Sequence, residues 1–225
     1  MGMREGTSTP DVDYHLRELR AVLDPRDPVR AVPDYPCTGW KVLDVGCGMG
    51  QTLLAPELRP AAELHGIDRD RAAIEFGRSR AGNAHLTLKC AAAESIPYED
   101  GSFDLVYSRV TVPYTNVPVT LAEMHRVLKP DGHLWLSLIP LNAELTRLKS
   151  ALEHLQVRTA LDSGYVLANS VLLAFSGHCW ARPWNGKYDT VQTRRSTARL
   201  LRRAGFRHIE MRLSARHFVV TATGS

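Results

Sequence analysis

Cysteine is sparse in this sequence of 225 residues, and no two cysteines form a Cys-x-x-Cys pair. The four of them lie far apart, at Cys37, Cys47, Cys90 and Cys179. This spacing argues against a secreted disulfide scaffold and against a zinc ribbon. We therefore expect reduced thiols and no metal site.

Long apolar runs are also lacking. The most apolar stretch, residues 165–175, contains Asn169 and Ser170, and it is far shorter than the ~20 residues that cross a bilayer. The first six residues lack the apolar core of a signal peptide. We therefore expect a cytoplasmic protein that does not interact with a membrane.

Lysine is rare among the basic residues, since only five of the 28 are lysine, and the formal net charge is +4. Such an excess suggests nucleic acid binding, but proteome-wide use of arginine would produce the same balance. The densest arginine cluster, residues 194–207, has no interleaved aromatic side chains for base stacking. It is typical of a solvated helix face, so nucleic acid is not the expected partner.

The remaining composition, 44% hydrophobic and 23% charged, is that of a globular protein with one large domain. From residue 40, strand and helix patterns alternate, which predicts a parallel sheet with helices on both faces. The expected strands are residues 41–45, 63–67, 85–90, 103–107, 133–139, 208–213 and 217–222. The expected helices are residues 14–23, 52–58, 71–80, 119–128, 145–155, 166–175 and 196–204.

A glycine-rich turn follows the first expected strand, in the run Val-Leu-Asp-Val-Gly-Cys-Gly-Met-Gly of residues 42–50. Glycine permits positive φ angles and a close approach of the backbone to a ligand. A helix after the turn would direct its first N–H groups at that ligand. A dinucleotide fingerprint would need a small residue at position 51, where Gln51 stands, and no Lys-Ser/Thr follows for a P-loop.

Asp68 stands at the end of the second expected strand. A carboxylate at this place in a doubly wound fold accepts hydrogen bonds from both ribose hydroxyls of an adenosine cofactor. Strand, glycine turn, helix, strand and terminal Asp, in that order, therefore predict an adenosine-containing cofactor.

With these residues in view, a family resemblance can be stated. Residues 42–50 resemble the first motif of class I S-adenosylmethionine-dependent methyltransferases. Residues 93–98, 101–106 and 123–132 are similar to the type 11 subgroup, and Arg-Val-Leu-Lys-Pro-x-Gly is specific to it and its close relatives. The resemblance covers roughly residues 40–140 well and 193–222 loosely, but not 1–39 or 141–192.

The resemblance implies an α/β fold. It is a doubly wound, mostly parallel, seven-stranded Rossmann-like sheet, with a helical insertion before the last two strands. We expect residues 1–39 to form a helix and connector, 40–140 the cofactor-binding core, 141–192 the insertion, and 193–225 the final helix and strand pair. A monomer and a homodimer are both compatible with the sequence.

The resemblance also implies S-adenosylmethionine as the cofactor. The cofactor-binding residues it indicates are Asp44, Gly46, Cys47, Gly48, Gly50, Asp68, Arg69, Ala93, Glu94 and Ser108. The glycines would cradle the methionine part, Asp44 its ammonium through water, and Asp68 the ribose. Cys47 has packing as its alternative role.

Ala92 departs from the family pattern, which usually places an adenine-binding Asp there. Adenine would then rely on Glu94 or on backbone groups near Ala93. The departure leaves open a non-catalytic S-adenosylmethionine-binding protein on the same scaffold.

Methyl transfer needs mainly in-line positioning, because the cofactor supplies the electrophile. We expect an enzyme acting on a small-molecule acceptor, with the insertion and the N-terminal helix forming the acceptor pocket. An RNA methyltransferase that uses the arginine face is an alternative. The sequence does not indicate which acceptor or which atom is methylated. If a proton must leave the acceptor, the candidate bases are Tyr14, His15, Tyr114 and His178.

Overall fold

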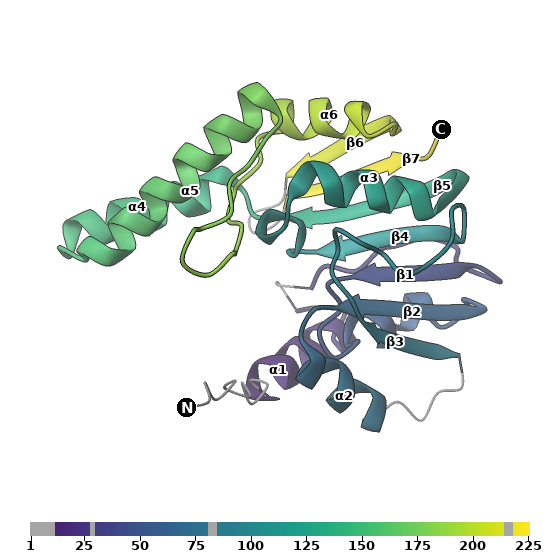
Figure 1. The fold of residues 1–225 in the computed structure, drawn as a ribbon. Helices are drawn as coiled ribbons and strands as arrows, with labels where there is room; N and C mark the ends of the chain where they lie inside the picture. The colour runs from purple at the N-terminus through teal and green to yellow at the C-terminus, as the bar shows by residue number, and fades with distance from the viewer. Residues whose placement is uncertain (1–11, 28–29, 81–84, 214–217) are drawn as a thin grey trace, which may run out of the picture.

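The computed structural model describes residues 12–27, 30–80, 85–213 and 218–225 (Figure 1). Its centre is a seven-stranded sheet with the strand order β3-β2-β1-β4-β5-β7-β6. The strands are β1 Lys41–Val45, β2 Glu63–Asp68, β3 Leu86–Cys90, β4 Phe103–Arg109, β5 Leu128–Leu138, β6 Arg207–Leu213 and β7 Phe218–Thr223. Neighbours from β3 to β5 are parallel, and β7 runs antiparallel to both β5 and β6. The predicted fold, with its reversed final strand, is confirmed.

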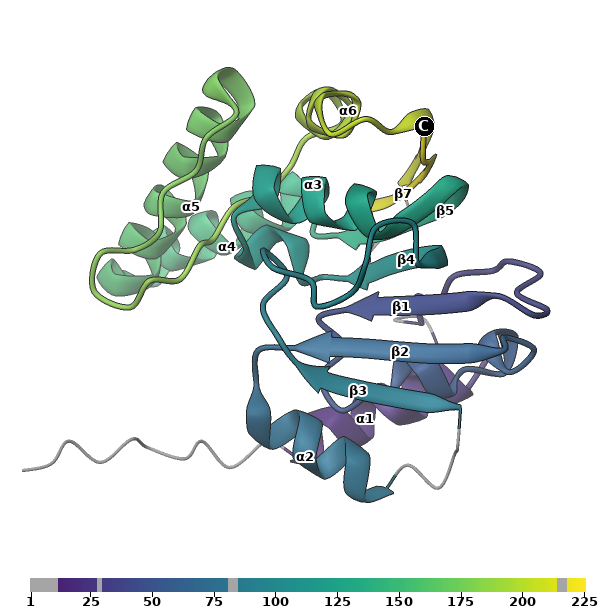
Figure 2. The same ribbon diagram turned by 45° about the vertical axis from the view of Figure 1, so that its right-hand side comes forward.

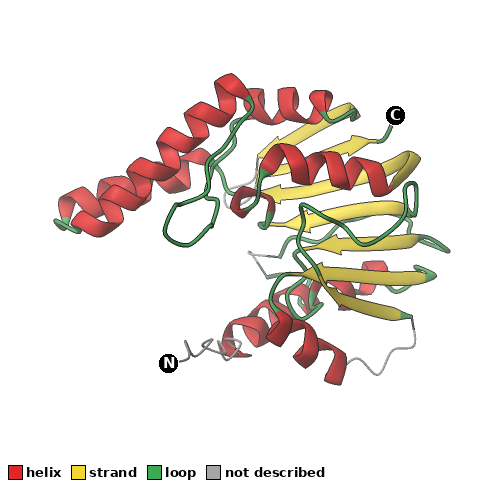
Figure 3. Ribbon diagram, in the orientation of Figure 1, coloured by secondary structure: helices red, strands yellow, loops and turns green. Residues whose placement is uncertain are grey.

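Helices cover both faces of this sheet (Figure 3). The central strands are therefore buried on both sides. Leu43 of β1 belongs to a core shared with α3 (Val117–Val127) and α6 (Arg194–Arg203). Its neighbour Val42 belongs to a second core shared with α1 (Val12–Leu23) and α2 (Arg71–Arg80). Successive side chains of a strand point to opposite faces, so two apolar layers form, as a doubly wound fold requires.

The segment after the glycine turn differs from the prediction. In place of a helix over residues 52–58, the chain forms two short 3₁₀ turns, Thr52–Leu54 and Pro56–Leu58. Between them Ala55 is extended, with φ −60° and ψ 141°. A proline disfavours the helical conformation in the residue before it, and Pro56 therefore interrupts the helix. Residues 52–58 therefore do not provide the α-helix N-terminus that was expected after the glycine turn.

The insertion forms a helical hairpin of α4 (Leu141–Glu153) and α5 (Val157–Ser176), which projects from the sheet in both ribbon views (Figure 2). α5 begins earlier than the predicted residue 166. Gly177, with φ +81°, ends α5 in the left-handed conformation typical of helix C-termini. A loop over residues 178–193 then returns to α6, whose first turn is capped by Thr193 and Ser196. Among the described residues, no helix is long and apolar enough to cross a membrane.

Candidate functional site

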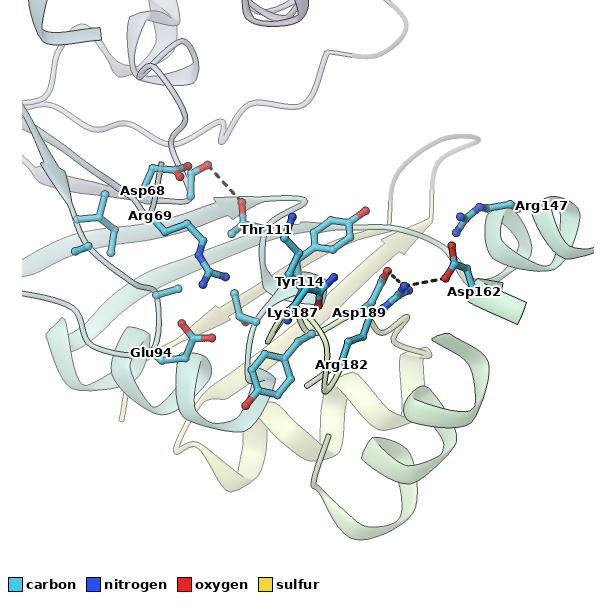
Figure 4. A pocket seen from close by; sticks show the side chains of 17 residues that line it. Asp68, Arg69, Glu94, Thr111, Tyr114, Arg147, Asp162, Arg182, Lys187 and Asp189 are labelled. Atoms are coloured by element: carbon cyan, nitrogen blue, oxygen red, sulfur yellow. Dashed lines mark hydrogen bonds and ion pairs between the residues drawn. The ribbon is translucent and has the colours of Figure 1, made fainter. Parts of the chain in front are cut away.

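A cavity of about 460 Å³ lies where β1, β2 and β4 end and the insertion loop passes (Figure 4). One side, here called the nucleotide half, includes Gly46, Ile67, Asp68, Arg69, Ala93 and Glu94. The other side, here called the insertion half, includes Tyr114, Arg147, Asp162, Arg182, Lys187 and Asp189. Carboxyl ends of strands are where open α/β sheets bind ligands, so the cavity lies at the expected edge.

The glycine turn has the backbone that its sequence predicts. Gly46, Gly48 and Gly50 adopt φ angles of +83°, +55° and +82°. The N–H groups of Gly46 and Cys47 both donate to the Ile67 carbonyl oxygen, at 2.8 and 3.0 Å, which joins the turn to β2. Residues with a side chain rarely adopt these left-handed backbone angles. The turn therefore favours glycine at the three positions.

Asp68 connects this turn to the end of β2. Its Oδ2 accepts the Gly48 N–H at 2.8 Å, and its Oδ1 accepts the Asp70 N–H at 2.9 Å. A carboxylate oxygen can accept two hydrogen bonds. Each oxygen of Asp68 can therefore accept one more, from a donor in the cavity that Asp68 lines. The side chain thus orders the turn and remains able to accept two hydroxyl groups, which supports the predicted ribose-binding role.

Asp44 lies beneath the turn and is fully buried, with no hydrogen-bond partner for its Oδ1. The pKa of Asp44 is raised to about 7, because burial and the nearby Asp68 carboxylate together outweigh the opposing effects of Tyr107 and Arg109. A buried carboxylate oxygen without a hydrogen-bond partner is costly, and an approaching cation reduces that cost. Asp44 therefore suits a ligand with an ammonium group.

Five of the ten predicted cofactor residues do not line the cavity: Asp44 and Gly48, described above, and Cys47, Gly50 and Ser108. Ser108 is buried and donates its hydroxyl proton to the Val45 carbonyl at 2.7 Å. Cys47 is buried beside Gly66, and burial raises the pKa of its thiol well above the ordinary value. Gly50 contacts Leu88, since a β-carbon there would lie 3.2 Å from that side chain. Of the predicted residues, the cavity brings together Gly46, Asp68, Arg69, Ala93 and Glu94.

Glu94 links the nucleotide half to the start of α3. Its Oε1 accepts the Asn116 N–H at 2.9 Å. The Asn116 side chain in turn donates to the Tyr188 hydroxyl at 3.4 Å, and Tyr188 belongs to the insertion loop. Ala92 contributes no lining, and its carbonyl accepts the Ser95 N–H at 3.2 Å. Glu94 therefore keeps one carboxylate oxygen for the cofactor side.

The segment after β4 was not predicted to hold a site residue other than Tyr114. Val110 has a φ angle of +63°, which is an outlier for a β-branched residue. The next residue, Thr111, lines the cavity, with its Oγ1 3.3 Å from the Gly46 carbonyl oxygen and 3.4 Å from that of Arg109. Strained backbone is concentrated at functional sites, and here it directs Thr111 onto the glycine turn.

Arg182 organises the insertion half. Its side chain is 12% exposed and pairs with Asp162 at 2.8 Å and Asp189 at 3.2 Å. The guanidinium also lies 4.6 Å from the centre of the Tyr165 ring. Burial raises the pKa of Asp189, which Arg182 opposes. Sequence reasoning missed these residues because no family motif covers the insertion.

The structure places two of the four candidate bases, Tyr114 and His178, in different surroundings. Tyr114 lines the cavity and is 45% exposed. His178 is exposed and is not among the described residues that line the cavity. The side chains of Tyr14 and His15 lie outside the described residues. The part of α1 whose side chains are described, residues 17–23, does not line the cavity, and the role predicted for the start of this helix stays a prediction.

α1 is instead tied to the end of β4. Glu18 forms an ion pair with Arg109 at 2.5 Å, beside the strained Val110. Both side chains are largely buried. The N-terminal helix therefore supports the segment that carries Thr111.

Comparison with known proteins identifies a methyltransferase domain over residues 43–136. The ubiquinone/menaquinone biosynthesis C-methyltransferase UbiE of Citrifermentans bemidjiense is 35% identical over 139 residues, covering 57% of this chain and 58% of the relative. A demethylmenaquinone methyltransferase of Staphylococcus aureus is 39% identical over 100 residues, covering 42% of this chain and 41% of the relative. The chain thus spans 41–58% of the length of these two relatives.

Solved structures show the same fold at low identity. An S-adenosylmethionine-dependent methyltransferase from Methanosarcina mazei superimposes with a TM-score of 0.57 at 22% identity, covering 85% of this chain and 94% of the other. A geranyl diphosphate methyltransferase in complex with S-adenosylmethionine gives a TM-score of 0.58 at 13% identity, with coverages of 95% and 85%. These similarities support the architecture alone.

The residues present fit S-adenosylmethionine. The buried Asp44 carboxylate lacks a partner for one oxygen, the three glycines have left-handed backbones, and Asp68 keeps free acceptor sites. No group of three or more metal-ligating side chains forms within the described ranges. The matched domain over residues 43–136, the sheet order and the glycine turn make this chain similar to class I S-adenosylmethionine-dependent methyltransferases of the type 11 subgroup.

Proposed function

We propose that this chain transfers the methyl group of S-adenosylmethionine to a small-molecule acceptor bound in the insertion half of the cavity. One observation carries the proposal. A single cavity joins five of the predicted cofactor residues, Gly46, Asp68, Arg69, Ala93 and Glu94, to the insertion, with Thr111 between the two halves. A concave site with a few convergent polar groups is the usual form of a small-molecule pocket.

S-adenosylmethionine supplies an electrophilic methyl group, so the protein needs little covalent chemistry of its own. The glycine turn admits the ligand closely, while Asp68 and Asp44 provide acceptors for hydroxyl and ammonium groups. The insertion half holds the acceptor in line, and such orientation accounts for much of the rate gain in reactions of this kind. Tyr114 is the candidate to receive a proton when the acceptor must lose one.

The cofactor part of the proposal is tested by calorimetric titration with S-adenosylhomocysteine. We expect saturable binding below millimolar concentration, and the variant Asp68→Ala should lose at least tenfold in affinity. The matched control is Glu75→Ala, since this carboxylate is exposed on α2. Retained affinity in Asp68→Ala would refute the ribose assignment, and absent binding by the unaltered protein would refute the proposal.

The acceptor part is tested by incubating the protein and cofactor with a pool of small molecules and searching by mass spectrometry for the gain of one methyl group. An RNA acceptor is not proposed. No described residue of α6 lines the cavity, and Arg199 is half-buried, with its Nε and one terminal nitrogen enclosed. The expected arginine face of α6 is therefore smaller than the sequence predicts.

A further inference from the structure

The insertion presents its polar side chains to the cavity. Every side chain that the described part of residues 141–192 contributes to the lining is charged, an amide or a phenol. Figure 4 shows Arg182 between Asp162 and Asp189, with Lys187 nearer the centre of the cavity. A ligand that fills this half must therefore satisfy charges and hydrogen bonds.

The large apolar side chains of the same insertion lie elsewhere. Leu155, Leu161 and Trp184 are 86%, 70% and 70% exposed, and none of them lines the cavity. Covering charged groups with an apolar chain costs free energy unless they are paired. The insertion half is therefore poorly suited to a lipophilic acceptor such as an isoprenoid quinone.

The charges of this half are not all neutralised in the same way. Arg182 is satisfied by the two carboxylates that it bridges. The Arg147 side chain is 46% exposed, and its ion pair with Glu144 is long at 3.4 Å. Lys187 is exposed and makes no ion pair with any described residue. These two cations remain available to a ligand.

Resting on the methyl transfer proposed above, we propose that the acceptor is a small polar molecule with a carboxylate or phosphate group. Lys187 and Arg147 hold this anion, while the nucleophilic atom lies near Thr111 and Tyr114. Arginine matches the planar geometry of carboxylate and phosphate, and lysine adds a compact positive charge. The anion thereby sets which end of the acceptor faces the methyl group.

The experiment is calorimetric titration of the protein saturated with S-adenosylhomocysteine. The probes are 4-hydroxybenzoate, 4-hydroxyphenyl phosphate, the neutral 4-hydroxybenzamide, and 1,4-naphthalenediol as a lipophilic phenol. We expect at least one anion to bind at least tenfold more tightly than the amide and the naphthalenediol. Whether the benzoate or the phosphate binds better distinguishes the two kinds of anion.

Variants assign the effect to the two cations. Lys187→Gln and Arg147→Gln should each weaken binding of the preferred anion at least tenfold and leave the affinity for S-adenosylhomocysteine unchanged. The control Lys149→Gln removes an exposed cation of α4 that pairs with Glu153 and does not line the cavity, and it should change neither affinity.

Several results would overturn the inference. They are an amide or naphthalenediol that binds as tightly as the anions, absent binding of both anions, or a preference for anions that survives both substitutions. The titration with S-adenosylhomocysteine alone tests only the proposed cofactor site. Absent binding in that titration would refute the cofactor site, whereas the results above would refute only the anionic acceptor.

Discussion

The side chain of Thr111 occupies the space that a β-carbon on Gly46 would need. Its Oγ1 lies 3.3 Å from the Gly46 carbonyl oxygen, and an ideal β-carbon there would overlap the Thr111 Oγ1, Cβ and Cγ2 atoms. The backbone of the glycine turn thus packs directly against a side chain of the segment after β4. This contact fixes the junction between the two halves of the cavity.

Gly46→Ala should therefore be strongly destabilising. The substitution places a side chain at a φ angle of +83° and against Thr111. Gly101→Ala is the matched control, because Gly101 has a φ angle of +63° and nothing within 4 Å of its added β-carbon. The left-handed backbone costs about 1–2 kcal/mol at either site, and overlap adds about 1–3 kcal/mol at position 46. Urea unfolding measures both, and equal losses would contradict the packing described.

Val110→Asn should be more stable than Val110→Ala. Val110 is β-branched and has a φ angle of +63°, whereas asparagine is enriched in this left-handed region. Both substitutions remove the same half-buried apolar side chain, so their difference isolates the backbone preference. We expect about 1 kcal/mol in favour of asparagine, measured by urea unfolding. Equal stabilities would mean that the position stores no strain of this kind.

The sequence predicted the candidate cofactor residues that are defined by backbone geometry and by the order of the motifs. Gly46, Gly48, Gly50 and Asp68 lie where the order of strand, turn and strand requires. The prediction of a helix over residues 52–58 was wrong because Pro56 disfavours the helical conformation of Ala55. The insertion charges could not be predicted, because Arg147, Asp162 and Arg182 meet only when the helical hairpin and its return loop fold together.

Thr111 illustrates the same limit at shorter range. Its position after a predicted strand was visible in the sequence, but its role depends on the φ angle of Val110. A β-branched residue gives no local signal for a left-handed backbone, since its own preference opposes it. Tertiary contacts at the end of β4 impose the conformation, including the 2.8 Å bond from the Val110 N–H to the Ser137 carbonyl.

Binding of S-adenosylhomocysteine should strengthen as the pH rises from 6 to 8. Burial raises the pKa of Asp44 to about 7 in the free protein, and the ligand ammonium favours the ionised carboxylate. Below pH 7 the carboxyl group must lose a proton on binding, so affinity should rise about tenfold across this range. Calorimetry at several pH values measures it.

Asp44→Asn is the control for that titration. The variant should bind more weakly at pH 8 and show no change of affinity with pH. The stability of the free protein is a second measurement, and it should change with pH in the opposite direction to the affinity. A carboxyl group whose pKa is raised by folding favours the folded state when protonated, so stability should fall as the pH rises from about 4 to about 7. Affinity that is flat or falls with pH in the unaltered protein would contradict the role of Asp44.

Arg182→Met should lower stability more at pH 8 than at pH 5.5. Without the guanidinium, Asp189 loses the charge that opposes its already raised pKa, so that pKa rises further and its ionised form becomes unfavourable. The loss should be about 1–3 kcal/mol at pH 8, because one partner of a largely buried ion pair is left alone. At pH 5.5 protonation of Asp189 relieves part of it. Urea unfolding at the two pH values provides the measurement.

The double variant Arg182→Met/Asp189→Asn should recover most of that loss at pH 8, because it removes the stranded charge. Lys149→Met breaks only the exposed 3.7 Å pair with Glu153, and such pairs contribute about 0–1 kcal/mol. Affinity for S-adenosylhomocysteine should be unchanged in all three, since Arg182, Asp189 and Lys149 lie outside the nucleotide half. If Arg182→Met were equally destabilised at both pH values, or not rescued by Asp189→Asn, Arg182 would act by packing rather than by neutralising the two carboxylates.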